Sequence, residues 1–256
     1  MEYNLEKDSK KIFNGKQEYY SKYRPIYPIE LFDFLNKEYN IRNKVIVELG
    51  AGTGIFSKKV SSYCKKLYYI EPNDDMINKG KEYCNNCNNI VFINKCAEST
   101  ELTEDSADMV LAVQCFHWFD KQKVKNEVNR ILKSQGDFAI IWTNWKEDNN
   151  TFGKEYFNYI SAWNTKLTGQ KYQHKNETDR NNFFRNGTYK TYTFTHSKKY
   201  TLNMLIGFSK SLSFAPKEKE EYDNEFIDGI TTIFNKYKKN DIVQFDFNTE
   251  MYIGKI

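Results

Sequence analysis

The stretch VIVELGAGTG (residues 45–54) joins a run of apolar, mostly β-branched residues to three glycines at alternate positions. The whole chain of 256 residues holds only 12 glycines, so three within five residues indicate a special turn. A nearly continuous apolar run is typical of a strand buried on both faces of a parallel sheet. Glycine at the exit of such a strand allows a tight turn and a close approach of a ligand to the backbone. The stretch therefore predicts a buried strand that ends at a ligand-binding turn.

The glycine spacing differs from that of a dinucleotide-binding turn, which has the pattern G-x-G-x-x-G. Here Gly50, Gly52 and Gly54 are followed by Ile55, and Glu48 precedes the turn. A glycine turn by itself can also be a simple connection between a strand and a helix. Its meaning therefore depends on the residues at the ends of the neighbouring strands.

Four further apolar runs follow the first, with helical patterns between them. They span residues 67–71, 90–94, 109–114 and 138–143. Between them, apolar residues recur at helical spacing at Ile55, Phe56, Val60 and Tyr63, and again at Val124, Val128, Ile131 and Leu132. Strands that alternate with helices predict an α/β fold with a doubly wound, mostly parallel sheet.

The flanking regions predict additions to this sheet within one domain. Helical patterns cover residues 29–39, 152–167 and 220–237, and strand-like alternation covers residues 189–195 and 243–256. We expect a single domain over residues 1–256. In this division residues 1–40 form a helical lid, residues 41–145 form the ligand-binding core, and residues 146–256 form a cover with closing antiparallel strands.

Composition narrows the class of protein. Nowhere in the chain is there an apolar run near the ~18 residues needed to cross a membrane. The net charge of +4, from 38 basic and 34 acidic residues, is spread along the chain and does not by itself indicate a nucleic-acid partner. The five cysteines are an odd number for a disulfide framework. We expect a cytoplasmic protein.

Cys84 and Cys87 form a C-x-x-C pair, a spacing also found in zinc and redox sites. No second pair and no suitably spaced histidines complete a zinc site. We therefore expect ordinary thiols at a helix end and no bound metal.

Polar or special residues stand at the ends of four successive predicted strands. Besides the glycine turn, these are Glu71, the segment KCAES (residues 95–99) and the segment QCFHWFD (residues 114–120). The carboxyl ends of parallel strands meet at one edge of a sheet, where ligands of open α/β sheets bind. A carboxylate such as Glu71 can accept two hydrogen bonds from a ribose diol. One site explains all four positions.

Two motifs give the chain a specific resemblance. YSKYRPIYP (residues 20–28) resembles an N-terminal Y-x-x-x-R-P-x-Y-P motif, and residues 96–120 are similar to a stretch with A-E, a small-acidic-D group and Q-x-F-H-W-F-D. Both are typical of class I S-adenosylmethionine-dependent methyltransferases of the branch that is trans-aconitate methyltransferase-like and ubiquinone/menaquinone-biosynthesis-like. The resemblance covers most of residues 19–143 and continues weakly through residues 209–214 and through Thr249 and Tyr252. It implies a Rossmann-like, seven-stranded sheet with one C-terminal antiparallel strand.

The resemblance also implies roles for individual residues in binding S-adenosylmethionine. The residues that it assigns to the cofactor are Tyr20, Arg24, Glu48, Gly50, Gly52, Glu71, Pro72, Ala97, Glu98 and Gln114. Gly50 and Gly52 would pass under the methionine part, Glu71 would hold the ribose, and Ala97 with Glu98 would meet the adenine. Gln114 would border the methionine end, where Arg24 is a partner for the carboxylate. Cys96 stands where many relatives carry an acid that accepts from the adenine.

The acceptor side is less defined. His117 is expected either to take a proton from a hydroxyl acceptor or to orient a loop. Trp118 and Trp145 are expected near the acceptor, and Phe116, Trp118 and Tyr20 are candidates for cation–π contact with the sulfonium. The expected reaction is methyl transfer to the carboxylate or hydroxyl of a small molecule. An RNA methyltransferase of the same fold and a non-catalytic S-adenosylmethionine-binding regulator are the alternatives, and the oligomeric state stays open.

Overall fold

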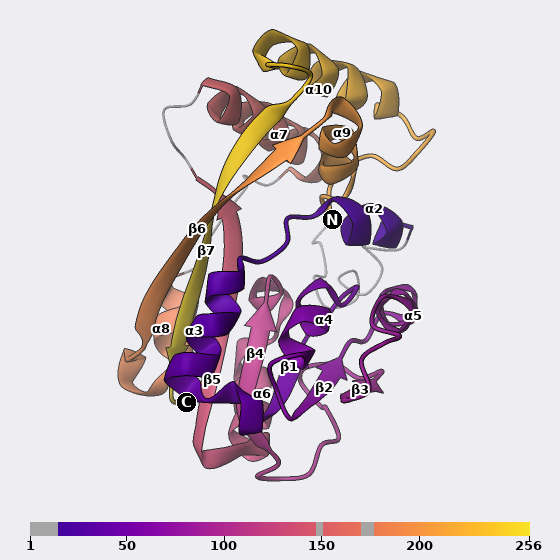
Figure 1. Cartoon of the computed structure of the whole chain (residues 1–256). Helices are drawn as coiled ribbons and strands as arrows, with labels where there is room; N and C mark the ends of the chain where they lie inside the picture. The colour runs from indigo at the N-terminus through magenta and orange to yellow at the C-terminus, as the bar shows by residue number, and fades with distance from the viewer. Residues whose placement is uncertain (1–14, 147–150, 170–176) are drawn as a thin grey trace.

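A computed structural model describes residues 15–146, 151–169 and 177–256, which form a layered α/β structure (Figure 1). Its centre is a seven-stranded sheet in the order β3-β2-β1-β4-β5-β7-β6. The strands are β1 (Val45–Leu49), β2 (Lys66–Ile70), β3 (Ile90–Ile93), β4 (Ala107–Val113), β5 (Leu132–Trp145), β6 (Lys190–Tyr200) and β7 (Val243–Gly254). β7 is antiparallel to both of its neighbours, β5 and β6. The pairs from β3 to β5 are all parallel, so the predicted fold class is confirmed.

Three helices cover one face of the sheet. They are α3 (Ile29–Tyr39), α4 (Ile55–Ser61) and α5 (Asp74–Tyr83). The apolar side of α3 is fully buried against β1 and α4, through residues such as Phe32 and Leu35. The helix predicted over residues 29–39 is therefore part of the packed core. Residues 1–14 of the expected lid lie outside the described residues.

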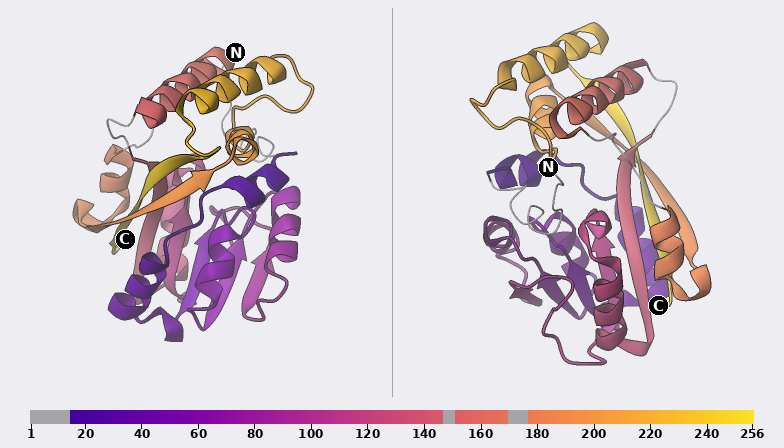
Figure 2. Two further views of the ribbon diagram at one scale, coloured as in Figure 1. Left: turned by 45° about the horizontal axis from the view of Figure 1, so that its top comes forward. Right: turned by 180° about the vertical axis from the view of Figure 1, so that it is seen from behind.

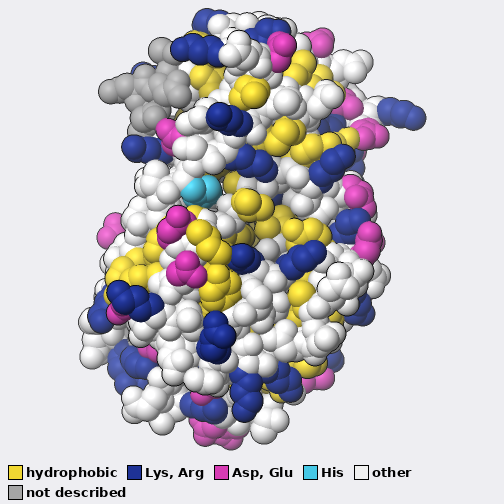
Figure 3. All heavy atoms as spheres, in the orientation of Figure 1, with side chains coloured by type: hydrophobic (Ala, Val, Ile, Leu, Met, Phe, Trp, Pro, Cys, Tyr) yellow, Lys and Arg dark blue, Asp and Glu magenta, His cyan; other side chains and the backbone are white. Residues whose placement is uncertain are grey.

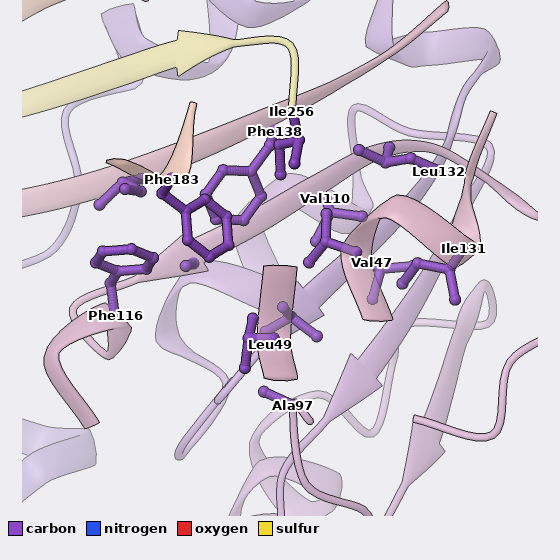
Figure 4. Packing of buried hydrophobic residues seen from close by; sticks show 14 of the residues in the cluster. Val47, Leu49, Ala97, Val110, Phe116, Ile131, Leu132, Phe138, Phe183 and Ile256 are labelled. Carbon is purple, nitrogen blue, oxygen red and sulfur yellow. The ribbon is translucent and has the colours of Figure 1, made fainter. Parts of the chain in front are cut away.

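Two helices cover the opposite face, α6 (Lys121–Ile131) and α8 (Glu177–Phe183). Phe116 and Phe138 pack there against Phe183, with ring centroids 4.9 and 4.8 Å from it (Figure 4). Val47 and Leu49 from β1 lie in the same cluster. The buried strands therefore present apolar side chains to both layers, as their continuous apolar sequences predict.

The far ends of β5, β6 and β7 extend beyond the parallel strands into a second cluster. There they pack with α7 (Thr151–Thr168), α9 (Leu202–Lys210) and α10 (Asp223–Tyr237). We call these three helices the cap, and Figure 2 shows them above the carboxyl ends of the parallel strands. The short helix α2 (Gln17–Tyr23) lies between the cap and the parallel sheet. Among the described residues, no helix has both the length and the apolar character required to cross a membrane.

Candidate active site

A cavity of about 360 Å³ lies at the carboxyl ends of β1, β2 and β4. This volume falls within the usual range for small-molecule sites. The residues that line it are Tyr20, Gly50, Gly52, Glu71, Pro72, Asn73, Met76, Cys96, Ala97, Glu98, Val113, Gln114, Cys115, Trp118, Phe119, Asp120 and Lys123. The four strand ends singled out in the sequence therefore do meet around one space.

The glycine turn after β1 supplies the floor of this cavity. Gly50 and Gly52 have φ angles of +63° and +62°, in the left-handed region that L-residues rarely adopt. A Cβ atom on Gly52 would meet nothing within 4 Å and would project into open space, whereas one on Gly50 would lie 2.9 Å from Cβ of Cys115. Gly52 therefore exposes backbone to the cavity, and Gly50 allows the turn to pack against the end of β4.

Glu71 is held at the end of β2 by two backbone donors. Its Oε2 accepts from the Gly52 amide at 2.8 Å, and its Oε1 accepts from the Asn73 amide at 2.9 Å. Each carboxylate oxygen keeps a further lone pair, and the residue lines the cavity. Burial raises the pKa of Glu71 to about 7, and the two backbone hydrogen bonds limit that rise. The group can therefore exchange a proton near neutral pH.

The wall opposite Glu71 is built by the residues that follow β4. Gln114 has a φ of +60°, and its amide nitrogen and side-chain Nε2 donate to the carbonyls of Ile141 and Thr143, at 2.9 and 2.8 Å. Both carbonyls belong to β5. The strained turn at Gln114 is therefore tied to the neighbouring strand, and it is followed by the short helix η2 (Phe116–Trp118), of which Trp118 lines the cavity.

The third wall joins the loop after β3 to the start of α6. Ala97 and Glu98 both line the cavity, and Glu98 Oε1 accepts from the Asp120 amide at 3.1 Å. Asp120 in turn caps α6 by accepting from the Lys123 amide. Cys96 also lines the cavity, so this loop offers an adenine-sized ligand a thiol and backbone groups besides the Glu98 carboxylate.

Helix α2 brings Tyr20 to the cavity and is attached on two sides. On the cap side, Nζ of Lys16 donates to the carbonyls of Leu212, Ser213 and Ala215, at 2.7 to 2.8 Å. On the core side, an ion pair of 2.8 Å joins Glu18 to Lys79 of α5. The ordered attachment of α2 places Tyr20 over the cavity, and its role as a mobile lid stays a prediction.

Five of the residues expected at the site do not line this cavity, and one of them, Phe116, is buried in the core cluster with Phe138 and Phe183. Arg24 lies behind Tyr20, with its guanidinium carbon 4.7 Å from the Tyr20 ring centroid, and it donates to the carbonyl of Ser211 at 3.0 Å. Glu48 is buried beneath the glycine turn, where it accepts from Ser57 Oγ at 2.6 Å, and burial raises its pKa to about 8. Trp145 is buried in the cap cluster among aromatic rings.

His117 is the last of these five residues. It lies on η2 with its side chain exposed, and its ring centroid is 4.5 Å from that of Trp118. Although part of the side chain is accessible, the protein around the ring disfavours its charged form and lowers the pKa of His117 to about 4, and the nearby cations Lys121 and Arg24 add to this effect. The imidazole is therefore neutral at pH 7.

Several cavity residues were not predicted from the sequence. Asn73 caps α5 by accepting from the Met76 amide at 2.9 Å, and both residues line the cavity. An asparagine before a helical pattern is a recognisable capping signal, so the EPND segment could have drawn attention to Asn73. Phe119 lies within the QCFHWFD segment but was given no role of its own, and Lys123 carries no such local signal. Among the described residues, no group of three metal-binding side chains lies together.

Comparison with known proteins shows similarity to methyltransferases. Residues 47–140 match the family described as a methyltransferase domain. An uncharacterized methyltransferase of Schizosaccharomyces pombe is 27% identical over 241 residues, which cover 91% of this chain and 92% of that protein. A second uncharacterized methyltransferase-like protein of the same yeast is 32% identical over 131 residues, and the match covers half of each chain.

Solved structures agree on the fold. A protein of Anaeromyxobacter dehalogenans proposed to be a type II methyltransferase superposes with a TM-score of 0.64 at 15% identity, over 91% of this chain and 97% of that one. In its fold and in the matched part of its core, the chain is therefore similar to S-adenosylmethionine-dependent methyltransferases of class I. S-adenosylmethionine is the cofactor of such enzymes. The finer resemblance to the trans-aconitate and ubiquinone/menaquinone branch stays a prediction.

Proposed function

We propose that this chain transfers the methyl group of S-adenosylmethionine to an oxygen of a small-molecule acceptor. The observation that carries the proposal is that Glu71 and the backbone of Gly52, which are joined by a hydrogen bond of 2.8 Å, line the same cavity. A carboxylate with free lone pairs suits a ribose diol, and the open space above Gly52 suits a ligand that runs along the backbone. Both features fit the cofactor, which supplies an electrophilic methyl group when bound.

The remaining lining residues fit the other parts of the cofactor. We assign Ala97 and Glu98 to the adenine, Pro72 to the ribose side, and Gln114 to the methionine end. Tyr20 would cover the cofactor from α2, and Arg24 would reach the methionine carboxylate from behind Tyr20. Glu48 would not touch the cofactor. It would support the glycine turn from beneath, through its hydrogen bond with Ser57. In this proposal residues 1–40 supply the lid through α2, residues 41–145 hold the cofactor, and residues 146–256 enclose the acceptor.

Methyl transfer from a sulfonium is an in-line displacement, so alignment and exclusion of water are the main demands on the protein. A general base is most effective when its pKa is near the working pH. The pKa of about 4 makes His117 a weak base, which favours a role in positioning the acceptor. A carboxylate acceptor is already ionised at neutral pH and needs no base, so we favour it over a hydroxyl.

The alternatives find less support. A nucleic-acid methyltransferase would be expected to present a basic surface, whereas the charge is only +4 and basic side chains are scattered over the face shown in Figure 3. A non-catalytic regulator would need only the cofactor cavity, and turnover on an acceptor is the observation that separates it from an enzyme. Transfer to a small molecule therefore remains the better proposal.

The direct test is incubation with S-adenosylmethionine and a library of small acids and alcohols, read by release of S-adenosylhomocysteine. A separate measurement with a short RNA pool tests the first alternative. Calorimetry with S-adenosylhomocysteine alone tests cofactor binding. Tight binding without turnover on any acceptor would favour the regulator, and turnover only with RNA would overturn the proposal.

Cofactor binding should depend on pH through Glu71. The ribose hydroxyls donate to the ionised carboxylate, so binding lowers the Glu71 pKa below its value of about 7 in the empty protein. A proton is then released on binding below pH 7. Affinity for S-adenosylhomocysteine should rise with pH, by at most about tenfold per unit, and level off above pH 7 to 7.5. Calorimetry in two buffers of different ionisation enthalpy measures the proton. Glu71→Gln should remove the dependence, and an affinity that falls with rising pH would contradict this assignment.

The His117→Ala variant separates a base from a positioning residue. In a positioning role, the change should raise the KM of the acceptor roughly tenfold and leave kcat and cofactor affinity nearly unchanged. For a hydroxyl acceptor that needs a base, kcat should instead fall by about 10²- to 10⁴-fold. Steady-state kinetics with the acceptor found in the library distinguish the two. Loss of cofactor binding in this variant would contradict both roles.

A further inference from the structure

Trp142 and Trp145 lie three positions apart on β5, so their side chains point to opposite faces of the sheet. Trp145 packs into the cap cluster, with its ring centroid 5.8 Å from that of Phe157 and 6.3 Å from that of Phe208. Trp142 instead lies against the cluster that holds Phe138 and Phe183, and it is only half-buried. Of the two tryptophans, Trp142 therefore has ring surface to offer a ligand.

The turn after β4 brings η2 onto Trp142. The amide and the side chain of Gln114 are bound to the β5 carbonyls of Ile141 and Thr143, the residues on either side of Trp142. As a result, the His117 ring centroid lies 5.1 Å from that of Trp142. The His117 ring also lies 4.5 Å from Trp118, which lines the cofactor cavity. A continuous series of three rings therefore leads from the cavity to β5.

These three rings differ from the aromatic side chains of the core. Most large core rings, such as Tyr69 and Phe138, are fully buried. In contrast, His117 is exposed, and Trp118 and Trp142 are half-buried. A neutral imidazole adds no charge of its own to this surface. Accessible aromatic faces beside the methionine end of the cavity would favour a flat ligand, because stacked rings gain energy beyond the area that they bury.

We infer that His117, Trp118 and Trp142 form an aromatic platform on which a planar, conjugated methyl acceptor stacks. The inference rests on the proposed function, since it places the acceptor beside the methionine end of the cofactor. It adds Trp142 as a residue that determines acceptor specificity, in place of Trp145. A saturated ring of the same size and charge would lose the stacking contact and should bind less well.

Two matched pairs of probes test the platform without knowledge of the natural acceptor. Benzoate is compared with cyclohexanecarboxylate, and phenol with cyclohexanol, each titrated by NMR against the protein saturated with S-adenosylhomocysteine. We expect the planar member of at least one pair to bind about 3- to 10-fold more tightly. Equal affinities within both pairs would overturn the inference.

Two variants of similar size identify the residue responsible. Trp142→Phe keeps a ring face, and Trp142→Leu replaces it with an apolar side chain that can still pack against the neighbouring cluster. The planar preference should persist in Trp142→Phe and disappear in Trp142→Leu, while affinity for S-adenosylhomocysteine stays within twofold of wild type in both. If both variants keep the preference, Trp142 is only a core residue and the inference fails. If both lose it with normal melting temperatures, the indole itself is required, which supports the platform.

The outcome is separable from that of the proposed function. S-adenosylhomocysteine binding is measured first and independently, so its absence counts against the proposed function alone. Normal cofactor binding with no planar preference in either pair counts against the platform alone.

Discussion

Replacement of Glu71 by alanine should weaken the binding of S-adenosylhomocysteine by about 30- to 150-fold. This corresponds to ~2 to 3 kcal/mol, the range for hydrogen bonds to a charged group that would be lost with the ribose diol. The protein should still fold, although the amides of Gly52 and Asn73 lose their acceptor. Calorimetry measures the affinity, and circular dichroism checks the fold.

Asp75→Ala is the matched control for this experiment. Asp75 is an exposed carboxylate four positions along, in the first turn of α5, and it does not line the cavity. Its removal should leave the affinity unchanged. Wild-type affinity in Glu71→Ala, or an equal loss in both variants, would place the ribose elsewhere.

Alanine at Gly50 and alanine at Gly52 should have different effects although the two backbones are alike. Both positions have φ near +60°, so each substitution costs ~1 to 2 kcal/mol of stability. Gly50→Ala should cost ~1 to 3 kcal/mol more, because its Cβ would lie 2.9 Å from Cβ of Cys115. Gly52→Ala adds no clash with the protein, but its Cβ projects into the cavity and should weaken cofactor binding by about 5- to 150-fold.

Chemical denaturation of the empty proteins measures the free energies of unfolding, and calorimetry measures cofactor affinity. The result that supports the site is the crossed pattern, with the larger stability loss at Gly50 and a clear affinity loss in a stable Gly52 variant. Equal stability losses would contradict the described packing of the turn. Full affinity in Gly52→Ala would mean that the cofactor does not pass over this residue.

The parallel part of the fold could be predicted because local sequence and burial agree there. Strands such as β1 and β4 are buried on both faces, so their sequences are apolar apart from one carboxylate each, Glu48 and Asp108, and need no tertiary information to be recognised. Helix α9 was not predicted, and it contains Gly207, a residue unfavourable to helices. That glycine is required by tertiary packing, since a Cβ there would lie 2.3 Å from the ring of Tyr23.

In the site, too, some residues could be placed from the local sequence, whereas others depend on tertiary packing. The cavity residues at strand ends, such as Glu71 and Gln114, could be placed because parallel strands bring their carboxyl ends together. The choice between Trp142 and Trp145 could not be made from the sequence. It depends on how far β5 extends beside β7, where Trp142 pairs with Glu250 and Trp145 with Phe247. Such a register is set by the pairing of distant segments and leaves no local pattern.

The length of β5 has a consequence for the cooperativity of unfolding. Its first part pairs with β4 in the core, and its last part pairs with β7 and carries Trp145 into the cap cluster. Melting of the cap would remove the packing from the ends of β5, β6 and β7. The hydrogen bonds between these strands, which continue into the core, would then begin to open from that end. We therefore expect the cap and the core to unfold as one cooperative unit. A ligand bound under the cap would slow hydrogen exchange at the glycine turn, although it touches no residue of that turn.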